Sequence, residues 1–234
     1  YSIKFNITMK KIFLIFLIFT SISVASEFKK FLNPRTLLKS ELISFFVNKE
    51  ISLNNLELKT NVTYVFTDGK SYEFEQKFKI SNKNLIKIKI YKLKIKLAEF
   101  FSDGKNAKLK RLFKDDKKRT EDNLNLRIFT KRLNLPIKTS ELTNILRGIP
   151  FNNMEFIKIE KNALNGISLI DANIVSQLNE NMDLVKVLMS GERSAIIEYS
   201  DYRKLANQSI PFLISVETDK FQMIIKVRSA IIKK

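Results

Sequence analysis

Cysteine, histidine and tryptophan are absent from the sequence, and its 234 residues include only 5 glycines and 4 prolines. The missing cysteine excludes disulfides, thiol nucleophiles and a cysteine-linked lipid anchor, and the missing histidine excludes a Ser-His-Asp triad. Zinc sites of the Cys/His type are excluded as well. The few scattered glycines do not form a phosphate-binding loop. We therefore expect no metal, no cofactor and no enzymatic activity.

The acidic residues offer the one enzymatic alternative that the sequence leaves open. Asp115-Asp116 and Glu121-Asp122 are adjacent carboxylates, but both pairs lie in the charged run 114–123. Such a run is typical of a solvated loop, which we predict here. A pair of carboxylates brought together only by the fold, as in glycosidases, is the remaining alternative.

The chain is strongly basic, with 42 lysines and arginines against 24 acidic residues and a net charge of +18. Nucleic-acid binding proteins need such residues for phosphate contacts. Lysine outnumbers arginine by 33 to 9, however, and arginine is preferred for bidentate recognition of phosphates and bases. The joint abundance of Lys, Ile, Asn and Phe is what an AT-rich coding sequence produces, with attraction to anionic lipid as the alternative. We expect no nucleic-acid partner.

Residues 9–25 have the pattern of a cleavable signal peptide. Two lysines follow Met9, an apolar run extends from Ile12 to Phe19, and the small residue Ala25 suits a cleavage site. The apolar run is shorter than the ~20 residues that span a bilayer, so a retained membrane anchor is the less favoured alternative.

The rest of the chain is divided into a short extension before the signal peptide and one domain after it. Residues 1–8 precede Met9 as an upstream extension, and residues 26–234 are expected to form a single domain. Export of a chain without cysteine fits a periplasmic protein whose fold does not depend on disulfides. We expect the exported protein to be soluble and not lipid-anchored.

Two helices are predicted. The first begins at Asn33-Pro34 and ends near Glu50, with Lys49 on its polar side. Its apolar side carries Leu38, Leu42, Phe45 and Phe46. The second helix is expected to be capped by Thr139 or Ser140, with Glu141 in its first turn, and to end at Gly148. Its apolar side carries Leu142, Ile145 and Leu146.

Between and after these helices, a period of two predicts about ten antiparallel strands. Two long strands, 56–66 and 72–80, flank the hairpin signal Thr67-Asp68-Gly69-Lys70. The alternation changes phase near Tyr91-Lys92, which indicates a bulge or a tight turn there. A second hairpin turns at 102–105. Later strands are predicted at 156–160, 167–174, 185–189, 195–199, 212–217 and 221–232.

These elements predict an α+β fold. A long, strongly curved antiparallel sheet with one apolar face would form an incomplete β-barrel, covered by the N-terminal helix and the short mid-chain helix. Such a barrel leaves an apolar concave face suited to lipid. The alternative is that the sheet packs on its helices and leaves no cavity. Eight residues define the apolar face: Leu58, Val62, Tyr64, Phe66, Phe74, Phe78, Ile88 and Ile90.

The lysines that alternate with this face, among them Lys87 and Lys89, cannot line the cavity because successive residues of a strand face opposite ways. One interpretation is that they solvate the outer face and protect it against edge-to-edge aggregation. The other is that they attract anionic headgroups.

Three segments resemble the periplasmic lipoprotein carrier and outer-membrane lipoprotein receptor superfamily (the LolA/LolB type). PIKTSELTNILRGIP (136–150) is similar to its helix motif, AEFFSDGKNAKL (98–109) to its strand ending in Ser-Asp-Gly, and EYSDYRKLANQSIPFLISVE (198–217) to its C-terminal hairpin. In the helix motif, the matching positions are Pro136, Leu142, Ile145, Leu146, Gly148 and Pro150. The order of leader, helix, hairpins, short helix and final strands also agrees.

The resemblance implies an incomplete barrel with a helical lid (Leu142, Ile145 and Leu146) that holds acyl chains in its concave face. It departs from the family in three places. The receptor's cysteine anchor is missing, the strands 56–80 lack the arginine with which the carrier branch holds its lid, and Asp68–Ser71 does not match the receptor's leucine-tipped loop.

We therefore expect a soluble, monomeric periplasmic carrier. Its partners would be the acyl chains of lipids or lipoproteins and, transiently, a membrane surface. The alternative is a structural or interaction module of the envelope without a ligand cavity.

Overall fold

The computed structural model describes residues 39–111, 122–123, 138–152, 154–155, 157–162, 166–191 and 194–233. The predicted signal peptide, the extension 1–8 and the start of the first helix at Asn33-Pro34 lie outside the described residues, as does most of the charged run 114–123.

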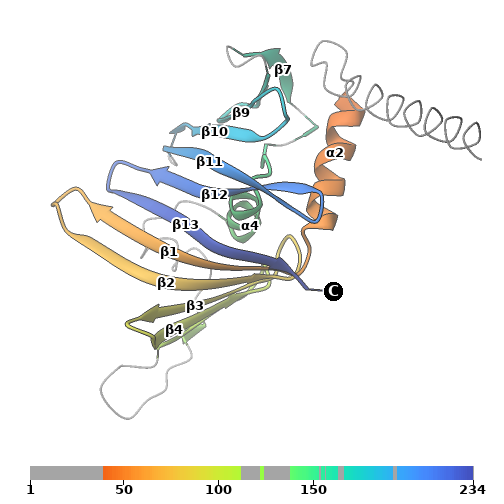
Figure 1. Ribbon diagram of the computed structural model, residues 1–234. Helices are drawn as coiled ribbons and strands as arrows, with labels where there is room; N and C mark the ends of the chain where they lie inside the picture. The colour runs from red at the N-terminus through yellow and green to blue at the C-terminus, as the bar shows by residue number, and fades with distance from the viewer. Residues whose placement is uncertain are drawn as a thin grey trace, which may run out of the picture.

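One antiparallel sheet contains all 13 described strands, in the order β6-β5-β4-β3-β2-β1-β13-β12-β11-β10-β9-β8-β7. The two ends of this order, β6 and β7, are edges that do not pair with each other, so the strongly curved sheet does not close (Figure 1). The strands are β1 (Leu56–Phe66), β2 (Ser71–Ile80), β3 (Ile86–Lys92), β4 (Ile95–Ser102), β5 (Ala107–Arg111), β6 (Asp122–Asn123), β7 (Lys158–Lys161), β8 (Ile167–Ile170), β9 (Ile174–Leu178), β10 (Leu184–Met189), β11 (Ala195–Leu205), β12 (Gln208–Glu217) and β13 (Phe221–Ile232).

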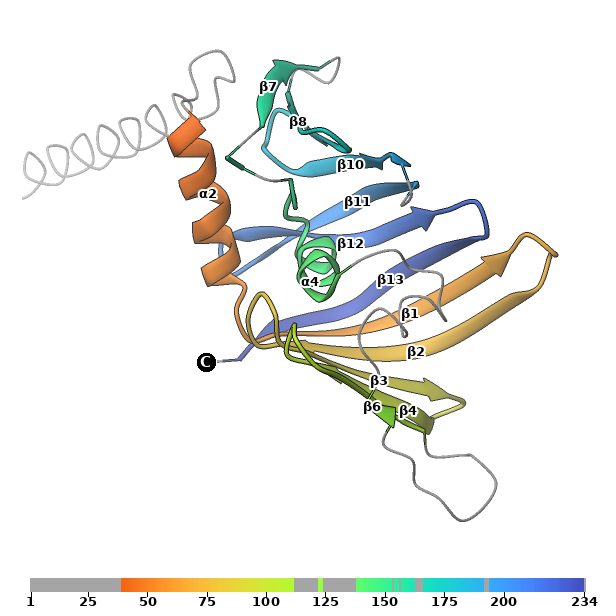
Figure 2. The same cartoon turned by 180° about the vertical axis from the view of Figure 1, so that it is seen from behind.

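Two helices accompany the sheet. Helix α4 (Thr139–Arg147) lies within its concave side against β12, and α2 (Lys39–Ser52) stands at the end of the sheet where β1 begins (Figure 2). The buried side chains of both helices and of the strands form one core, which includes Leu42, Leu58, Ile145 and Ile225. The α+β incomplete barrel predicted from the sequence is confirmed.

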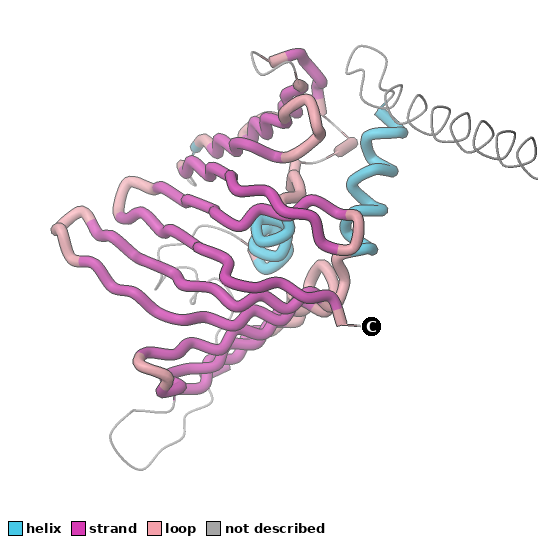
Figure 3. Tube along the Cα trace, viewed as in Figure 1, coloured by secondary structure: helices cyan, strands magenta, loops and turns pink. Residues whose placement is uncertain are grey.

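The strands with the most regular alternation form as predicted. β1 and β13 have the predicted bounds, and turns at 67–70 and 103–106 close the two predicted hairpins. The change of phase in the apolar alternation near Tyr91-Lys92 also has its predicted cause. The pairing of β3 with β4 shifts register between Ile90 and Tyr91, and a two-residue turn follows at Leu93-Lys94. Figure 3 shows the long, nearly continuous strands that result.

Strands were mispredicted where turns lack glycine. The predicted strand 167–174 is two strands, because Asp171 Oδ1 accepts hydrogen bonds from the backbone N–H groups of Asn173 and Ile174 and turns the chain. β11 continues beyond the predicted 199, because the hairpin turns only at Ala206-Asn207, both with positive φ. The predicted loop 114–123 is also shorter, since Asp122 and Asn123 pair with β5.

The predicted cap of the second helix was wrong as well. Lys138 is the N-cap residue, with φ −80° and ψ 166°, and its backbone N–H donates to Glu141 Oε2 at 2.5 Å. Thr139 is the first helical residue, and its hydroxyl bonds Ser102 Oγ at 2.9 Å. The predicted end is confirmed, because Gly148 adopts the left-handed conformation (φ 62°) that suits glycine after a helix.

Candidate functional site

The eight residues predicted for lipid binding share one face of the sheet. Directly opposed residues of neighbouring strands point to the same side. Leu58 lies opposite Phe78, which lies opposite Ile88, and Val62 lies opposite Phe74. Tyr64, Phe66 and Ile90 follow at alternate positions along their strands. This is the concave face, because its buried residues belong to the same core as Ile145 and Leu146 of α4.

The inner part of this face is filled by protein. Leu58, Val62, Phe78 and Ile88 are buried, as are Ile145 and Leu146 of the predicted lid helix, while Leu142 is half-buried and packs against the same core. These positions hold the fold together, and they are core residues in this structure. The outer part of the face differs.

Five aromatic residues gather on the concave face near the turns that join β1 to β2 and β12 to β13. We call Tyr64, Phe66, Tyr72, Phe74 and Phe221 the aromatic rim. The ring centroids of neighbouring members lie 6.0–6.4 Å apart, in edge-on or tilted geometries. This end of β1 and β2 extends past α4 (Figure 1). Phe66 and Tyr72 remain 40% and 43% exposed, so the rim presents an apolar, partly open surface.

One polar pair lies at the inner border of the aromatic rim. Gln76 is buried and its Nε2 donates to Tyr64 Oη at 3.3 Å. Burial raises the pKa of the Tyr64 phenol, and the hydrogen bond with Gln76 opposes that rise. The phenol therefore stays neutral at physiological pH, and the rim carries no charge from this residue.

Helix α4 is tied to the rest of the fold by polar contacts as well as by its apolar side. Thr143 Oγ1 donates to the carbonyl oxygen of Lys83 at 2.6 Å, in the segment between β2 and β3, and Thr139 bonds Ser102 at the end of β4. Both threonines are buried. From the sequence, Thr139 was considered only as a possible cap, and Thr143 was not identified as an anchor.

Two basic residues link the ends of α2 and α4. Lys49 was predicted on the polar side of its helix, which was wrong: it is only 2% exposed and its Nζ donates to the Gly148 carbonyl oxygen at 3.1 Å. Arg147 is fully buried, and its Nη2 donates to Asn54 Oδ1 at 3.3 Å. Burial lowers the pKa of Lys49 to about 8 and that of Arg147 to about 10, while Asp183 and Glu50 respectively oppose these shifts.

The hairpin between β3 and β4 exposes apolar side chains at its tip. Leu93 is 86% exposed and Ile95 54%, and both lie among lysines. Leu93 and Lys94 have φ values of 50° and 65°, which side chains other than Gly, Asn and Asp rarely adopt. Asp68, in the turn where sequence reasoning looked for an apolar tip, is instead paired with Lys70 (Oδ2 to Nζ, 2.7 Å).

Other kinds of site have no support in the described part of the chain. Those residues contain no group of three or more carboxylates that could hold a metal ion. None of the helices they form is both long enough and apolar enough to cross a membrane.

Neither a protein-family model nor a curated protein matches this sequence. Solved structures do match. A LolA superfamily protein from Nitrosomonas europaea gives a TM-score of 0.56 at 8% identity, covering 82% of this chain and 93% of its own. A DUF1329 family protein from Desulfovibrio piger gives a TM-score of 0.55 at 8% identity, and the match covers 81% of this chain and 91% of that protein.

An outer membrane lipoprotein-sorting protein domain from Vibrio parahaemolyticus gives a TM-score of 0.51 at 8% identity, covering 81% of this chain and 90% of its own. At this identity the likeness concerns the fold alone. The chain thus has a divergent LolA-like fold, as the sequence resemblance implied.

Proposed function

We propose that this protein is a periplasmic carrier that binds the acyl chains of lipids or lipoproteins at the aromatic rim. The observation that carries the proposal is the position of the rim: it continues the apolar concave face beyond the part that α4 fills, and Phe66 and Tyr72 stay exposed. An acyl chain lying along these rings would bury their apolar surface, which favours binding by about 25 cal/mol per Å².

The hydrogen bonds that hold α4 in place determine where we expect a lipid to enter. Its contacts with Ser102, Lys83 and α2 hold this helix in place, so we expect acyl chains to enter at the rim without displacement of α4. The rim is the site, and α4 is a fixed neighbour that fills the inner part of the same concave face. In this respect the proposal replaces the lid expected from the family resemblance.

The tip of the β3–β4 hairpin supports a transient contact with a membrane. Leu93 and Ile95 are apolar and exposed, and the neighbouring lysines (Lys92, Lys94 and Lys96) would favour an anionic surface. Single apolar side chains on a hairpin tip give weak, reversible binding, as a carrier requires. We propose no catalytic role for any residue, and we propose that the carrier acts as a monomer.

The alternative is an envelope interaction module without a lipid site. The filled inner part of the concave face favours it, because Leu58, Val62 and Phe78 already pack against protein.

Mass spectrometry of organic extracts separates the two functions. Protein purified from a membrane-containing host should carry lipid under the carrier proposal, and the amount should fall in the Phe66→Glu variant. Extracts that are free of lipid, after purification without detergent and after incubation with lipid vesicles, would support the interaction module.

A further inference from the structure

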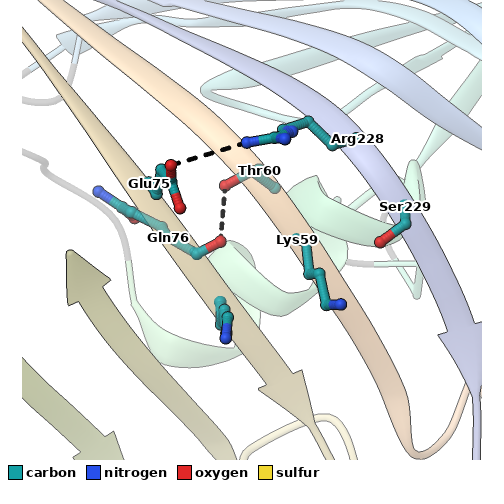
Figure 4. A pocket seen from close by; sticks show the side chains of 7 residues that line it. Lys59, Thr60, Glu75, Gln76, Arg228 and Ser229 are labelled. Carbon is teal, nitrogen blue, oxygen red and sulfur yellow. Dashed lines mark hydrogen bonds and ion pairs between the residues drawn. The ribbon is translucent and has the colours of Figure 1, made fainter. Parts of the chain in front are cut away.

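A β-bulge interrupts the pairing of β1 with β13 on the outer, convex face of the sheet. Lys59 pairs with Ser229 and Thr60 pairs with Val227, so Arg228 is the extra residue that has no direct partner on β1. Bulges redirect side chains and are common beside binding sites. From the bulge, the Arg228 side chain is directed toward Glu75, and Lys59 and Ser229 line the same pocket (Figure 4).

A pocket of about 430 Å³ lies at this bulge. Its charged lining residues are Lys59, Lys77, Arg228 and Glu75, which leaves an excess of two positive charges. Glu75 Oε1 lies 3.8 Å from Arg228 Nη1. Ser229 adds a hydroxyl group, and all of these side chains reach the pocket from three adjacent strands, β1, β2 and β13.

Lysines directly oppose one another at this place in the sheet. Lys59 lies opposite Lys77, and Lys77 lies opposite Lys89. Like charges in opposed positions destabilise a sheet. The row ends at Glu99, which lies opposite Lys89 but is paired with Lys87 and Lys96. Lys77 Nζ lies 4.9 Å from the centre of the Tyr91 ring. Within the described residues, Lys59 and Lys77 have no acidic partner.

Lys59 and Lys77 therefore face each other across β1 and β2 without an ion pair to a described acidic residue. We propose that the convex pocket binds a phosphate group, with Lys59, Lys77 and Arg228 as its cationic ligands and Ser229 as a neutral donor. Ammonium and guanidinium groups make charge-assisted hydrogen bonds to phosphate oxygens, and the guanidinium can bind two oxygens at once.

A phosphate in this pocket would relieve the repulsion between Lys59 and Lys77, and the volume of the pocket leaves room for the first group attached to the phosphate. Thr60 and Gln76 also line the pocket, but none of the five residues of the aromatic rim does, and the charged lining residues lie on the opposite face of the sheet from the rim. The proposal therefore does not depend on the carrier function.

The test uses the full chain, the double variant Lys59→Gln/Lys77→Gln, and the matched control Lys108→Gln/Lys110→Gln. The control removes the same charge from exposed positions of β5 on the same face but outside the pocket. Binding of inorganic phosphate and of glycerol 3-phosphate is measured by calorimetry. Co-sedimentation then compares vesicles of phosphatidylcholine with vesicles that also contain phosphatidylglycerol.

We expect the pocket variant to weaken binding by about tenfold or more and the control to change it less than about twofold. If the soluble phosphates bind, and the pocket variant loses this binding while the control keeps it, the proposal is supported and the ligand class is a free phosphate compound. The same pattern for anionic vesicles alone supports it with a lipid headgroup as the source.

Three results would overturn the proposal. In the first, neither phosphate nor vesicles bind. In the second, the pocket variant and the control lose binding equally, which indicates diffuse surface charge. In the third, an oligonucleotide binds instead, with equal loss in both variants. NMR gives an independent readout, since bound phosphate should shift the backbone amide signals of Thr60 and Ser229 more than those of Lys108 and Lys110.

Discussion

Lys49 and Arg147 each stand in the last turn of one helix and reach the end of the other. Lys49 of α2 donates to the carbonyl oxygen of Gly148, directly after α4, and Arg147 of α4 donates to Asn54, in the turn that follows α2. Cations are favoured at helix C-termini, where carbonyl oxygens lack partners. The two bonds therefore join the ends of both helices to each other.

The buried Lys49 should make stability depend on pH. Its pKa is about 8 in the folded protein and 10.5 in the unfolded chain, so between these values the unfolded state binds more protons. The free energy of unfolding should therefore rise as the pH increases from about 8 to about 10.5, by up to about 3 kcal/mol relative to Lys49→Met. Urea unfolding at a series of pH values measures this difference.

The exposed substitution Lys220→Met controls for the loss of one positive charge. If Lys49→Met and Lys220→Met show the same dependence of stability on pH as the native chain, the burial of Lys49 has no thermodynamic consequence and the account of this contact is wrong.

Arg147 should respond differently to two substitutions. Its Nε and Nη1 atoms have no hydrogen-bond partner among the described residues, and a buried charge with so few bonds contributes little net stability. Arg147→Met preserves most of the volume and should change the free energy of unfolding by less than about 1.5 kcal/mol, whereas Arg147→Ala should cost about 2–5 kcal/mol through the cavity it leaves. Equal losses in chemical denaturation would show that the charge itself stabilises the fold.

At the tip of the β3–β4 hairpin, a substitution that stabilises the turn should also weaken the proposed contact with a membrane. Leu93 and Lys94 both have positive φ, the geometry of a type I′ turn that favours Asn-Gly. The double variant Leu93→Asn/Lys94→Gly should raise the free energy of unfolding by about 0.5–1 kcal/mol. It should also slow the transfer of bound lipid to anionic vesicles, because the apolar tip is lost.

Leu93→Gln is the companion variant, because it removes the apolar side chain and leaves Lys94 in place. Stability should change little at this exposed position, and lipid transfer should slow as in the double variant. Unchanged transfer in both variants would remove the hairpin tip from the proposed mechanism.

Local patterns in the sequence predicted the parts of the fold that depend on neighbours along the chain. The alternation from Leu56 to Ile80 and the Asp68-Gly69 turn fixed β1, β2 and the face that Val62 and Phe74 share. The aromatic rim was only partly predicted. The alternation places Tyr72 on the same face as Phe74, although Tyr72 is not among the eight predicted residues. Phe221 joins the rim because β13 pairs with β1 across more than 150 residues, and no local pattern reveals such a pairing.

The buried charges escaped prediction for a different reason. Lysine and arginine are almost never fully buried unless paired, so Lys49 was assigned to the polar side of α2 and Arg147 was not considered. Their burial follows from the packing of two helix ends against each other. The signal available in the sequence was the position of both residues in the last turn of a predicted helix, where a basic residue can cap carbonyl oxygens.

The most direct test of the carrier account is the affinity for a fluorescent long-chain fatty acid, measured by titration of the full chain and of three exposed-position variants. Phe66→Glu and Tyr72→Glu place a charge in the aromatic rim, and Ile231→Glu places the same charge on the convex face, where Ile231 lies opposite Glu57 and is 50% exposed. The account predicts binding by the native chain, a loss of about tenfold or more in both rim variants, and no change in Ile231→Glu. Absence of binding by the native chain, or equal affinity in all four proteins, would contradict it.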